Sequence, residues 1–317
     1  MIAPTRRLAE LVEEFGARLS LFVDAGYLCR LQASVARFPR LEADLDLVTT
    51  QLKDLASRGH DIQLHIHPHW EDCSYDGKAW QIDVSRFKLQ DHPAEHQVDI
   101  VARYKRVLEG ISPNPVFAYR AGGWCIQPFN VIREALRREN VWLDSTLFAG
   151  GVSEDQVNGF DFRDMPASST YRFSDDPLIE DAGGFFLEVP ISSYPLRPRF
   201  YWEMALRKKF GGASHLPAGD GVVKGNSRGY YLSRLLSSSV SPVSVDGVKS
   251  RIVAGAYAKY LREGASGVFN VMGHPKSLTP FSYQQVSSFL SQVSPGAGFI
   301  TFQDLRFLEP AGSMAGL

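Results

Sequence analysis

Hydrophobic positions near the start of the chain change from a helical period to a strand-like run. Apolar side chains at helical spacing in residues 8–15 predict an amphipathic helix that stops at Gly16. The run RLSLFV, residues 18–23, then predicts a strand. A helix followed at once by a short apolar strand is typical of parallel α/β folds.

The same alternation continues along the chain. Residues 41–59 predict a second helix with Gly59 as its C-cap, and DIQLHI, residues 61–66, predicts the next strand. Further helices are expected over 94–109, 127–139 and 248–263, and further strands over 115–120, 141–145, 184–192, 266–274 and 299–302. Residues 203–245 are rich in glycine and serine, and we interpret them as an irregular insertion. The pattern therefore predicts an α/β fold with parallel strands.

Length and charge narrow the function classes. The chain has 317 residues, of which 44% are hydrophobic, and α/β barrels often fill such a length as one domain. We therefore expect a single domain over residues 1–317. A net charge of -1 supplies no general field for nucleic acid, and the one basic run, residues 206–210, is short.

Cysteine use and the apolar runs indicate the compartment. Cys29, Cys73 and Cys125 are too few and too widely spaced for a disulfide scaffold or a zinc finger. The first residues carry glutamates and lack the apolar centre of a signal peptide. No run of about 18 apolar residues occurs, so no membrane span is expected. These features predict a cytoplasmic protein.

Four of the eight histidines lie within residues 60–69. On an extended strand His65, His67 and His69 would share one face. His65 and His69 would then lie about 13 Å apart, at about 3.3 Å per residue. Zinc binds nitrogens at about 2.0–2.1 Å. The two rings can share an ion only if the chain turns after Ile66, and Pro68 favours such a turn.

Other interpretations of this cluster stay open. A histidine on an apolar segment can be a hydrogen-bonded core residue, and the group can also be an acid/base cluster or a polar loop. Among the four, His67 is the best candidate for a structural or supporting role. His60, at the junction of helix and strand, is expected to have no function.

The segment RGHDIQLHIHPHW, residues 58–70, resembles the second signature of the polysaccharide deacetylase superfamily, of the carbohydrate esterase family 4 type. In that signature a Gly-His-Asp/Glu lead-in precedes a strand and a His-x-x-x-His metal pair. The resemblance assigns the pair to His65 and His69. Ile66 departs from the small hydroxyl residue that usually follows the first histidine.

Three later segments resemble family signatures in the same order. YRAGGW, residues 119–124, is similar to the signature whose arginine, here Arg120, positions the catalytic carboxylate. FLEVPIS, residues 186–192, is similar to a groove-forming strand. VMGHPKS, residues 271–277, is similar to the last signature, which gives His274 the role of general acid. The resemblance covers residues 8–305 and is nearest to a subgroup associated with O-antigen and other surface-polysaccharide biosynthesis.

The family implies a fold, a cofactor and a substrate. The fold would be a deformed (β/α) barrel of about seven strands. The cofactor would be a divalent metal, most often zinc, held by two imidazoles and a carboxylate. The substrate would be a carbohydrate, and Trp70, Tyr119 and Trp124 could stack on its rings, although large aromatic side chains often belong to the core.

The family's first signature, a Thr-Phe-Asp-Asp strand, is the main departure. LFVDAG, residues 21–26, could supply one acid through Asp24. Residues 8–28 are more similar to the family's next helix and Thr-Phe-Phe-Val strand, and on that alignment the Asp-Asp strand would lie before Met1. Asp24 can then replace the missing acids as catalytic base and metal ligand, or it can cap a helix or turn. Asp72 and Asp76 are further candidates.

Three functional hypotheses follow. The first is a metal-dependent hydrolase that removes an N-acetyl group from a sugar of a surface polysaccharide or its precursor. The second is a catalytically silent carbohydrate-binding protein on the same fold. The third is another C–N hydrolase acting on a small amide or ureide, because fold alone does not fix the substrate. The sequence does not indicate the oligomeric state.

Overall fold

The computed structural model describes residues 1–155, 157–219, 228–264 and 267–310. The chain forms two compact units, each built from segments that are distant in sequence. Unit 1 comprises Met1–Ala17, Phe148–Gly151 and Pro190–Phe299, and unit 2 comprises Arg18–Leu147, Val152–Val189 and the segment from Ile300 onward.

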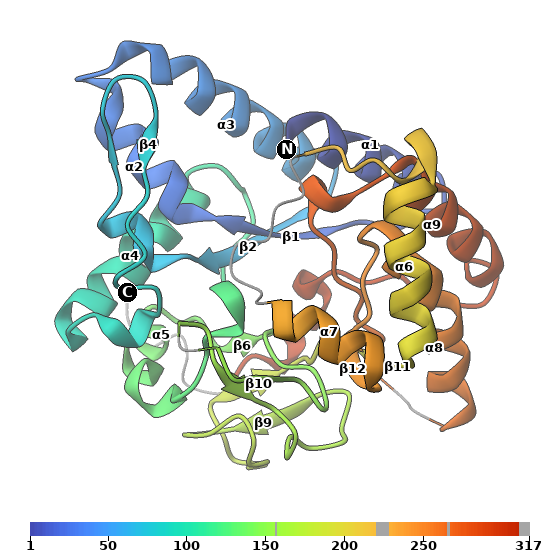
Figure 1. Cartoon of the computed structure of the whole chain (residues 1–317). Helices are drawn as coiled ribbons and strands as arrows, with labels where there is room; N and C mark the ends of the chain where they lie inside the picture. Colours follow the sequence, from blue (N-terminus) through green and yellow to red (C-terminus); the bar gives the residue numbers. More distant parts are fainter. Residues whose placement is uncertain (156, 220–227, 265–266, 311–317) are drawn as a thin grey trace. The chain divides into compact units, whose positions relative to one another are not determined.

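Unit 2 contains a six-stranded sheet in the order β1-β2-β5-β6-β10-β9 (Figure 1). Its strands are β1 (Ser20–Asp24), β2 (Asp61–Ile66), β5 (Ala118–Ala121), β6 (Leu143–Asp144), β10 (Phe186–Glu188) and β9 (Tyr171–Phe173). The first five are parallel to their neighbours, and β9 pairs antiparallel with β10 at the edge. Two small hairpins, β3 (Ser74–Tyr75) with β4 (Trp80–Gln81) and β7 (Val152–Ser153) with β8 (Phe160–Asp161), lie outside this sheet.

The helices of unit 2 are α2 (Ala25–Val35), α3 (Glu42–Ser57), α4 (Ala94–Glu109) and α5 (Arg133–Arg138). The first three pack against β2 (Figure 1). Strand β2 is buried over most of its length, including the apolar Ile62 and Leu64. A strand covered in this way is typical of parallel sheets in α/β folds.

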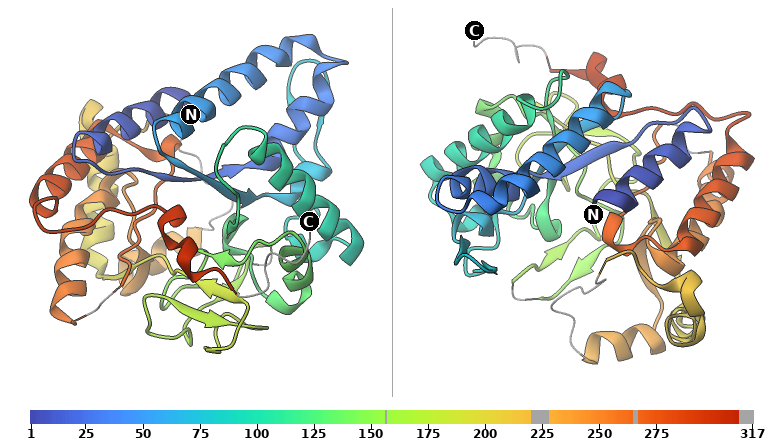
Figure 2. Two further views of the ribbon diagram at one scale, coloured as in Figure 1. Left: turned by 180° about the vertical axis from the view of Figure 1, so that it is seen from behind. Right: turned by 90° about the horizontal axis from the view of Figure 1, so that it is seen from above.

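Residues 302–308 form the 3-10 helix η9 (Phe302–Leu308), which closes the amino end of the sheet (Figure 2). Its Phe302 backbone N–H donates to Ser20 Oγ at 3.1 Å. Gln303 Nε2 donates to Asp61 Oδ1 at 3.0 Å and to the Pro115 carbonyl at 2.8 Å. Hydrogen bonds thus satisfy the buried polar groups at the end of the sheet opposite the histidines.

Unit 1 has one short antiparallel pair, β11 (Ser193–Leu196) with β12 (Ser239–Pro242), and five α-helices within its described residues. The helices are α1 (Ile2–Glu13), α6 (Pro198–Phe210), α7 (Arg228–Leu236), α8 (Ile252–Arg262) and α9 (Pro280–Val293). Its core includes Val243, Val253 and Ala256, packed against Phe269 and Phe289. Among the described helices, none combines the length and apolar character that a membrane crossing requires.

Most predicted elements are confirmed, and β2 has the predicted bounds. Two predicted strands are wrong. Within 267–274 the backbone forms only a single bridge, between Ser244 and Met272, and residues 299–302 lead into η9 instead of a strand. The predicted irregular insertion, residues 203–245, contains most of α6, all of α7 and β12, while its residues 220–227 lie outside the described chain. Helices α2 and α9 were not predicted.

Candidate functional site

Three of the predicted site residues form a row across the carboxyl ends of neighbouring strands. In the parallel register Asp24 of β1 lies opposite His65 of β2, and His65 lies opposite Arg120 of β5. Residues in register point to the same face of a parallel sheet. In α/β folds this end of the strands is where active sites form. The sequence prediction therefore placed these residues at the right end of the sheet.

Asp24 has one of its two carboxylate oxygens free of hydrogen bonds. Trp70 Nε1 donates to Oδ2 at 2.8 Å, whereas the buried Oδ1 has no hydrogen-bond partner among the described residues. Burial raises the pKa of Asp24 to about 6, against smaller lowering effects from Trp70 and His69. Asp24 stands at the N-cap position of α2, but its side chain makes no cap hydrogen bond. Its carboxylate is therefore available to take up a proton or a cation.

The chain turns after Ile66, as Pro68 predicts. His67 precedes the 3-10 helix η2 (Pro68–Glu71), in which Pro68 is the first residue. The His67 ring lies 4.6 Å from the His65 ring and 5.4 Å from the His69 ring, measured between centroids. The three imidazoles form one cluster, and His67 contacts both members of the predicted metal pair.

His65 and His69 are held in different ways. His65 Nδ1 lies 2.8 Å from the Arg120 carbonyl, a bond that fixes the ring and directs Nε2 away from the carbonyl. His69 is stacked between Trp70 at 5.5 Å and Phe87 at 5.7 Å, and its buried Nδ1 has no hydrogen-bond partner among the described residues. Burial and the neighbouring His67 lower the pKa of His69, which favours its neutral form.

Side chains of α2 and α4 fix the turn that carries His69. The Arg30 guanidinium donates to the carbonyls of Trp70 and Glu71. The Glu71 carboxylate accepts from Tyr104 Oη at 2.8 Å and from Arg103 at 2.9 Å. Such charge-assisted bonds hold a turn more firmly than neutral ones. The position of His69 is therefore set by the helical layer.

The donor atoms match zinc in kind, but they are not gathered into a ready site. Imidazole nitrogens and a carboxylate are usual zinc ligands, and Asp24 and His69 each keep a buried atom without a hydrogen bond. Across the described residues, however, no group of three or more histidine, cysteine, aspartate or glutamate side chains is close enough to hold a metal ion. Binding through His65, His69 and Asp24 would require these side chains to move.

Arg120 forms no ion pair with any described residue, in contrast to the prediction. Its Nε donates to the Ser145 carbonyl at 2.7 Å and its terminal nitrogen donates to Ser145 Oγ at 2.9 Å. The guanidinium also lies over the Phe22 ring, 4.2 Å from the centroid. Burial lowers the pKa of Arg120 to about 10, against the opposing effects of Asp144 and Glu188. Arg120 thus supports β6, and its backbone carbonyl, not its charge, contacts the histidine cluster.

A buried pair of acids behind Arg120 was not predicted. Asp144 of β6 lies opposite Glu188 of β10, and the two are 2% and 0% exposed. Burial and the Asp144 charge raise the pKa of Glu188 well above its usual value. The raised pKa favours the protonated, neutral form of Glu188 beside Asp144. A lone acid inside each apolar run, VWLDS and FFLEV, is the sequence signal for this pair.

In unit 1 His274 is paired with an aspartate that the sequence prediction missed. His274 Nδ1 lies 2.7 Å from Asp246 Oδ2, and the His274 backbone N–H donates to Asp246 Oδ1 at 2.7 Å. This pairing fixes Nδ1 as the donor and leaves Nε2 for other contacts. The His274 side chain is 47% exposed. A histidine oriented in this way can transfer a proton through Nε2.

The predicted sugar-stacking aromatics differ in exposure. Tyr119 is 2% exposed and has no face for a sugar ring, so its assignment was wrong. Trp70 is partly exposed and packs against Tyr27 and Trp80 while it holds Asp24. Trp124 is partly exposed and has a φ of 62°, a left-handed conformation that is costly for a bulky residue. Such strain often marks a functional turn.

Gly122, within YRAGGW, permits the close approach of β5 to the histidine turn. A Cβ at this position would lie 2.5 Å from His67 Nδ1 and 2.6 Å from the Ile66 carbonyl oxygen. Any side chain would therefore push the turn away from the strand. Packing against the histidine turn therefore explains the glycine at position 122.

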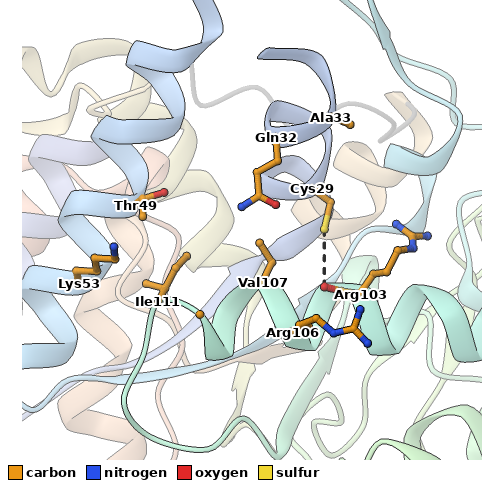
Figure 3. Close-up of a pocket in the computed structure, with 10 residues that line it drawn as sticks. Cys29, Gln32, Ala33, Thr49, Lys53, Arg103, Arg106, Val107 and Ile111 are labelled. Atoms are coloured by element: carbon orange, nitrogen blue, oxygen red, sulfur yellow. Dashed lines mark hydrogen bonds between the residues drawn. The ribbon is translucent and has the colours of Figure 1, made fainter. Parts of the chain in front are cut away.

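Unit 2 also has an open pocket of about 770 Å³ among α2, α3 and α4 (Figure 3). Cys29, Lys53, Arg103 and Arg106 are part of its lining, and the Cys29 thiol faces the Arg103 carbonyl at 4.0 Å. None of the predicted site residues is in this lining. A smaller pocket of about 250 Å³ is lined in part by Phe87, which stacks on His69. The smaller pocket is thus the one associated with the histidine cluster.

Comparison with known proteins identifies a similar fold, but no similar sequence family. Neither protein-family profiles nor curated protein sequences match this chain. Among solved structures, it is similar to the crystal structure of a putative polysaccharide deacetylase from Mycobacterium smegmatis. The two share 15% sequence identity and a TM-score of 0.52, over 98% of this chain and 78% of the other. The predicted fold class, α/β of the deformed (β/α) barrel type, is confirmed by this likeness.

Proposed function

We propose that the protein is a metal-dependent hydrolase that removes the N-acetyl group from a sugar of a surface polysaccharide or its precursor. The observation that carries the proposal is the row of Asp24 and His65 beside His69, at the carboxyl end of the sheet. The sequence signatures support this reaction class, and the mycobacterial structure that shares the fold is described as a polysaccharide deacetylase.

Asp24 is suited to act as the general base. Amide hydrolysis needs a group that removes a proton from the attacking water near neutral pH. The pKa of Asp24, about 6, leaves the carboxylate mostly ionised at pH 7 yet basic enough to accept a proton. Its free Oδ1 is the atom that would accept it. The Trp70 hydrogen bond holds the other oxygen in place.

His274 is suited to protonate the leaving amine. Asp246 orients its ring, as a carboxylate does in other acid–base pairs. Nε2 then delivers the proton to the amine nitrogen as the C–N bond breaks. The partial exposure of the ring allows it to be reprotonated from solvent.

We further propose that His65, His69 and Asp24 hold a divalent cation, zinc by the donor set. When bound, such a cation lowers the pKa of water and polarises the acetamide carbonyl. The bond from the Arg120 carbonyl to His65 is the kind of outer contact that orients a ligating imidazole. The buried Nδ1 of His69, which has no hydrogen-bond partner among the described residues, also supports this assignment, whereas Oδ1 of Asp24 can serve the cation or the proton but not both at once.

The test combines metal content with turnover. The double variant His65→Ala/His69→Ala should lose both bound zinc and deacetylation of N-acetylated sugars, while retaining its circular dichroism spectrum. His96→Ala, a partly exposed histidine on α4, is the matched control and should change neither. A double variant that keeps one zinc per chain would exclude these residues as the metal site.

One observation favours the second hypothesis, a carbohydrate-binding protein without catalysis. The described residues contain no assembled three-ligand group, and a binding protein needs none. Measured release of acetate from any N-acetylated sugar by the wild-type chain would exclude this alternative. Sugar binding without acetate release, with zinc supplied, would favour it.

A further inference from the structure

The pocket of about 770 Å³ among α2, α3 and α4 has charged lining residues of one sign (Figure 3). Lys53, Arg103 and Arg106 are cationic, and none of the described lining residues is acidic. The volume lies within the range of about 300–1,000 Å³ that is usual for small-molecule sites. A cleft whose charges share one sign raises the local concentration of ions of the opposite sign. Both the size and the charge of this pocket suit an anionic small molecule.

Two of the three cations have no partner within the described chain. The side chains of Lys53 and Arg106 form no hydrogen bond or ion pair with any described residue. Glu109, which follows Arg106 by three positions on α4, pairs instead with Lys105 at 3.5 Å. The charges of Lys53 and Arg106 are therefore left for a ligand.

Arg103 differs from these two cations because it is already paired. Its Nε donates to Asp99 at 2.7 Å, and a terminal nitrogen donates to Glu71 at 2.9 Å. The two carboxylates offset the charge of the guanidinium. Arg103 thus forms part of the wall, and the uncompensated charge of the lining comes from Lys53 and Arg106.

The rest of the lining combines apolar surface with neutral hydrogen-bonding groups. Val107 and Ile111 of α4 face the space between the helices, and Figure 3 shows the side chains of Gln32 and Thr49 directed towards it from α2 and α3. These two polar side chains make no hydrogen bond with any described residue. Burial raises the pKa of the Cys29 thiol to about 11, so this side chain is a neutral part of the wall. A ligand that matches the whole lining needs an apolar part as well as a charge.

We propose that this pocket binds an amphipathic anion, a molecule in which a phosphate or a carboxylate is attached to an apolar group. Lys53 and Arg106 attract the anionic group, Gln32 and Thr49 donate hydrogen bonds to it, and the apolar group lies on the α4 side chains. None of the candidate catalytic residues lines the pocket. The inference is therefore independent of the proposed function.

Three probes separate the two parts of such a ligand. Octyl phosphate has both an anion and an apolar chain, 1-octanol lacks the anion, and inorganic phosphate lacks the apolar chain. Isothermal titration calorimetry at low ionic strength should show one octyl phosphate per chain. Its affinity should exceed that of either other probe at least about tenfold, as expected for hydrogen bonds to a charged group.

The variants Arg106→Met and Lys53→Met remove one charge each and keep most of the apolar stem. Each should weaken octyl phosphate binding about tenfold and leave 1-octanol binding unchanged. Both side chains are exposed, so the circular dichroism spectrum should not change. Arg262→Met, which changes an exposed arginine of α8 in unit 1, is the matched control and should bind octyl phosphate as the wild type does.

Two further arms identify the source of the ligand and its place. Sedimentation with vesicles of phosphatidylcholine and phosphatidic acid, lost in Arg106→Met, would identify a lipid as the ligand, whereas binding of octyl phosphate alone would identify a soluble molecule. The double variant His65→Ala/His69→Ala should bind octyl phosphate as the wild type does. Loss of binding there would place the anion at the histidine cluster and overturn the proposal.

Equal affinity for octyl phosphate and 1-octanol would also overturn it, as would a preference for octyl phosphate that survives in both Arg106→Met and Lys53→Met. If these variants do not fold, hydrogen–deuterium exchange of the wild type decides the matter. Octyl phosphate should slow exchange in peptides that cover residues 103–111, and unchanged exchange there would exclude the site.

Discussion

Asp24 in unit 2 and Asp246 in unit 1 are both aspartates beside functional histidines, but their carboxylates are in different states. Both oxygens of Asp246 accept hydrogen bonds from His274. Among the side chains of the described residues only Trp70 donates to Asp24, and burial raises the pKa of Asp24 to about 6. A satisfied carboxylate orients a neighbour, whereas an under-satisfied buried one is ready to gain a proton or a cation. The comparison supports the proposal that Asp246 positions His274 and that Asp24 transfers the proton.

The largest expected effect comes from neutralising the under-satisfied acid. In Asp24→Asn the general base is lost, and kcat/KM for an N-acetylated sugar should fall about 10²–10⁴-fold. Asp164→Asn, which changes an aspartate of unit 2 outside the site, should retain activity. Steady-state kinetics on both variants checks the difference. Equal activity of Asp24→Asn and the wild type would end the assignment of Asp24 as the base.

Asp24→Asn should also affect the stability of the folded protein. Burial raises the pKa of Asp24 from 3.8 to about 6 in the folded chain. The folded state therefore holds the proton more strongly, and stability decreases as the pH rises from 3.8 to about 6. At pH 8 the asparagine variant should melt at the same or a higher temperature than the wild type. A lower melting temperature would show that the loss of activity has a structural cause.

A smaller effect is expected from the satisfied acid. Asp246→Asn keeps the shape of the side chain but removes the charge that supports His274, and kcat should fall about 10–100-fold with little change in KM. This is less than the whole contribution of a general acid, about 10²–10⁴-fold. Because the two residues act as a unit, adding Asp246→Asn to His274→Gln should cause no further loss. Losses that multiply would contradict the pairing.

The smallest effect on activity is expected from removing the Trp70 hydrogen bond to Asp24. Activity should decline as the pH falls through about 6, because the base must be ionised. The Trp70 hydrogen bond lowers the pKa of Asp24, so Trp70→Phe should move this acid limb to higher pH and leave the rate at pH 8 nearly unchanged. Trp80→Phe removes an indole whose ring centroid lies 5.4 Å from that of Trp70, and it should not move the acid limb of the pH–rate profile. A pH–rate profile in which both variants shift equally would point to packing instead.

Local patterns predicted much of the fold because the relevant forces are local. The apolar run DIQLHI and the following Pro68 gave both β2 and the turn after it. The prediction of a strand at residues 299–302 was wrong because Thr301 and Asp304 form a capping box. A capping box starts a helix, and here it outweighs an apolar run of four residues. Helix α2 begins directly after β1, without a loop or a side-chain cap hydrogen bond. The sequence therefore lacks the usual signals for the start of a helix at this point.

Packing explains why α2 starts with such an unusual helix sequence. Gly26 lowers helix propensity, yet a Cβ at this position would lie 2.7 Å from Tyr104 Oη and 2.8 Å from the Trp70 ring. The glycine is required by two side chains that are distant in the sequence. No pattern within residues 25–35 contains that information.

The sequence predicted which residues lie on the strand ends of the candidate site better than it predicted which partners they contact. His65, Asp24 and Arg120 were placed on strand ends by periodicity and family resemblance, and the register brings them into one row. The bonds of Arg120 to Ser145, and the pairing of Asp246 with His274, depend on chain segments 25 and 28 residues apart. Sequence spacing alone does not fix such distances, so the partners had to come from the structure.

The contacts of η9 with the first strands have a consequence for how the protein is made. Phe302 bonds to Ser20 across 282 positions, and Gln303 bonds to Asp61 across 242. A growing polypeptide on the ribosome cannot form these bonds until residues 302 and 303 have been translated. The amino end of the sheet therefore stays open to water and to chaperones until then, and unit 2 becomes complete only after η9 has been made.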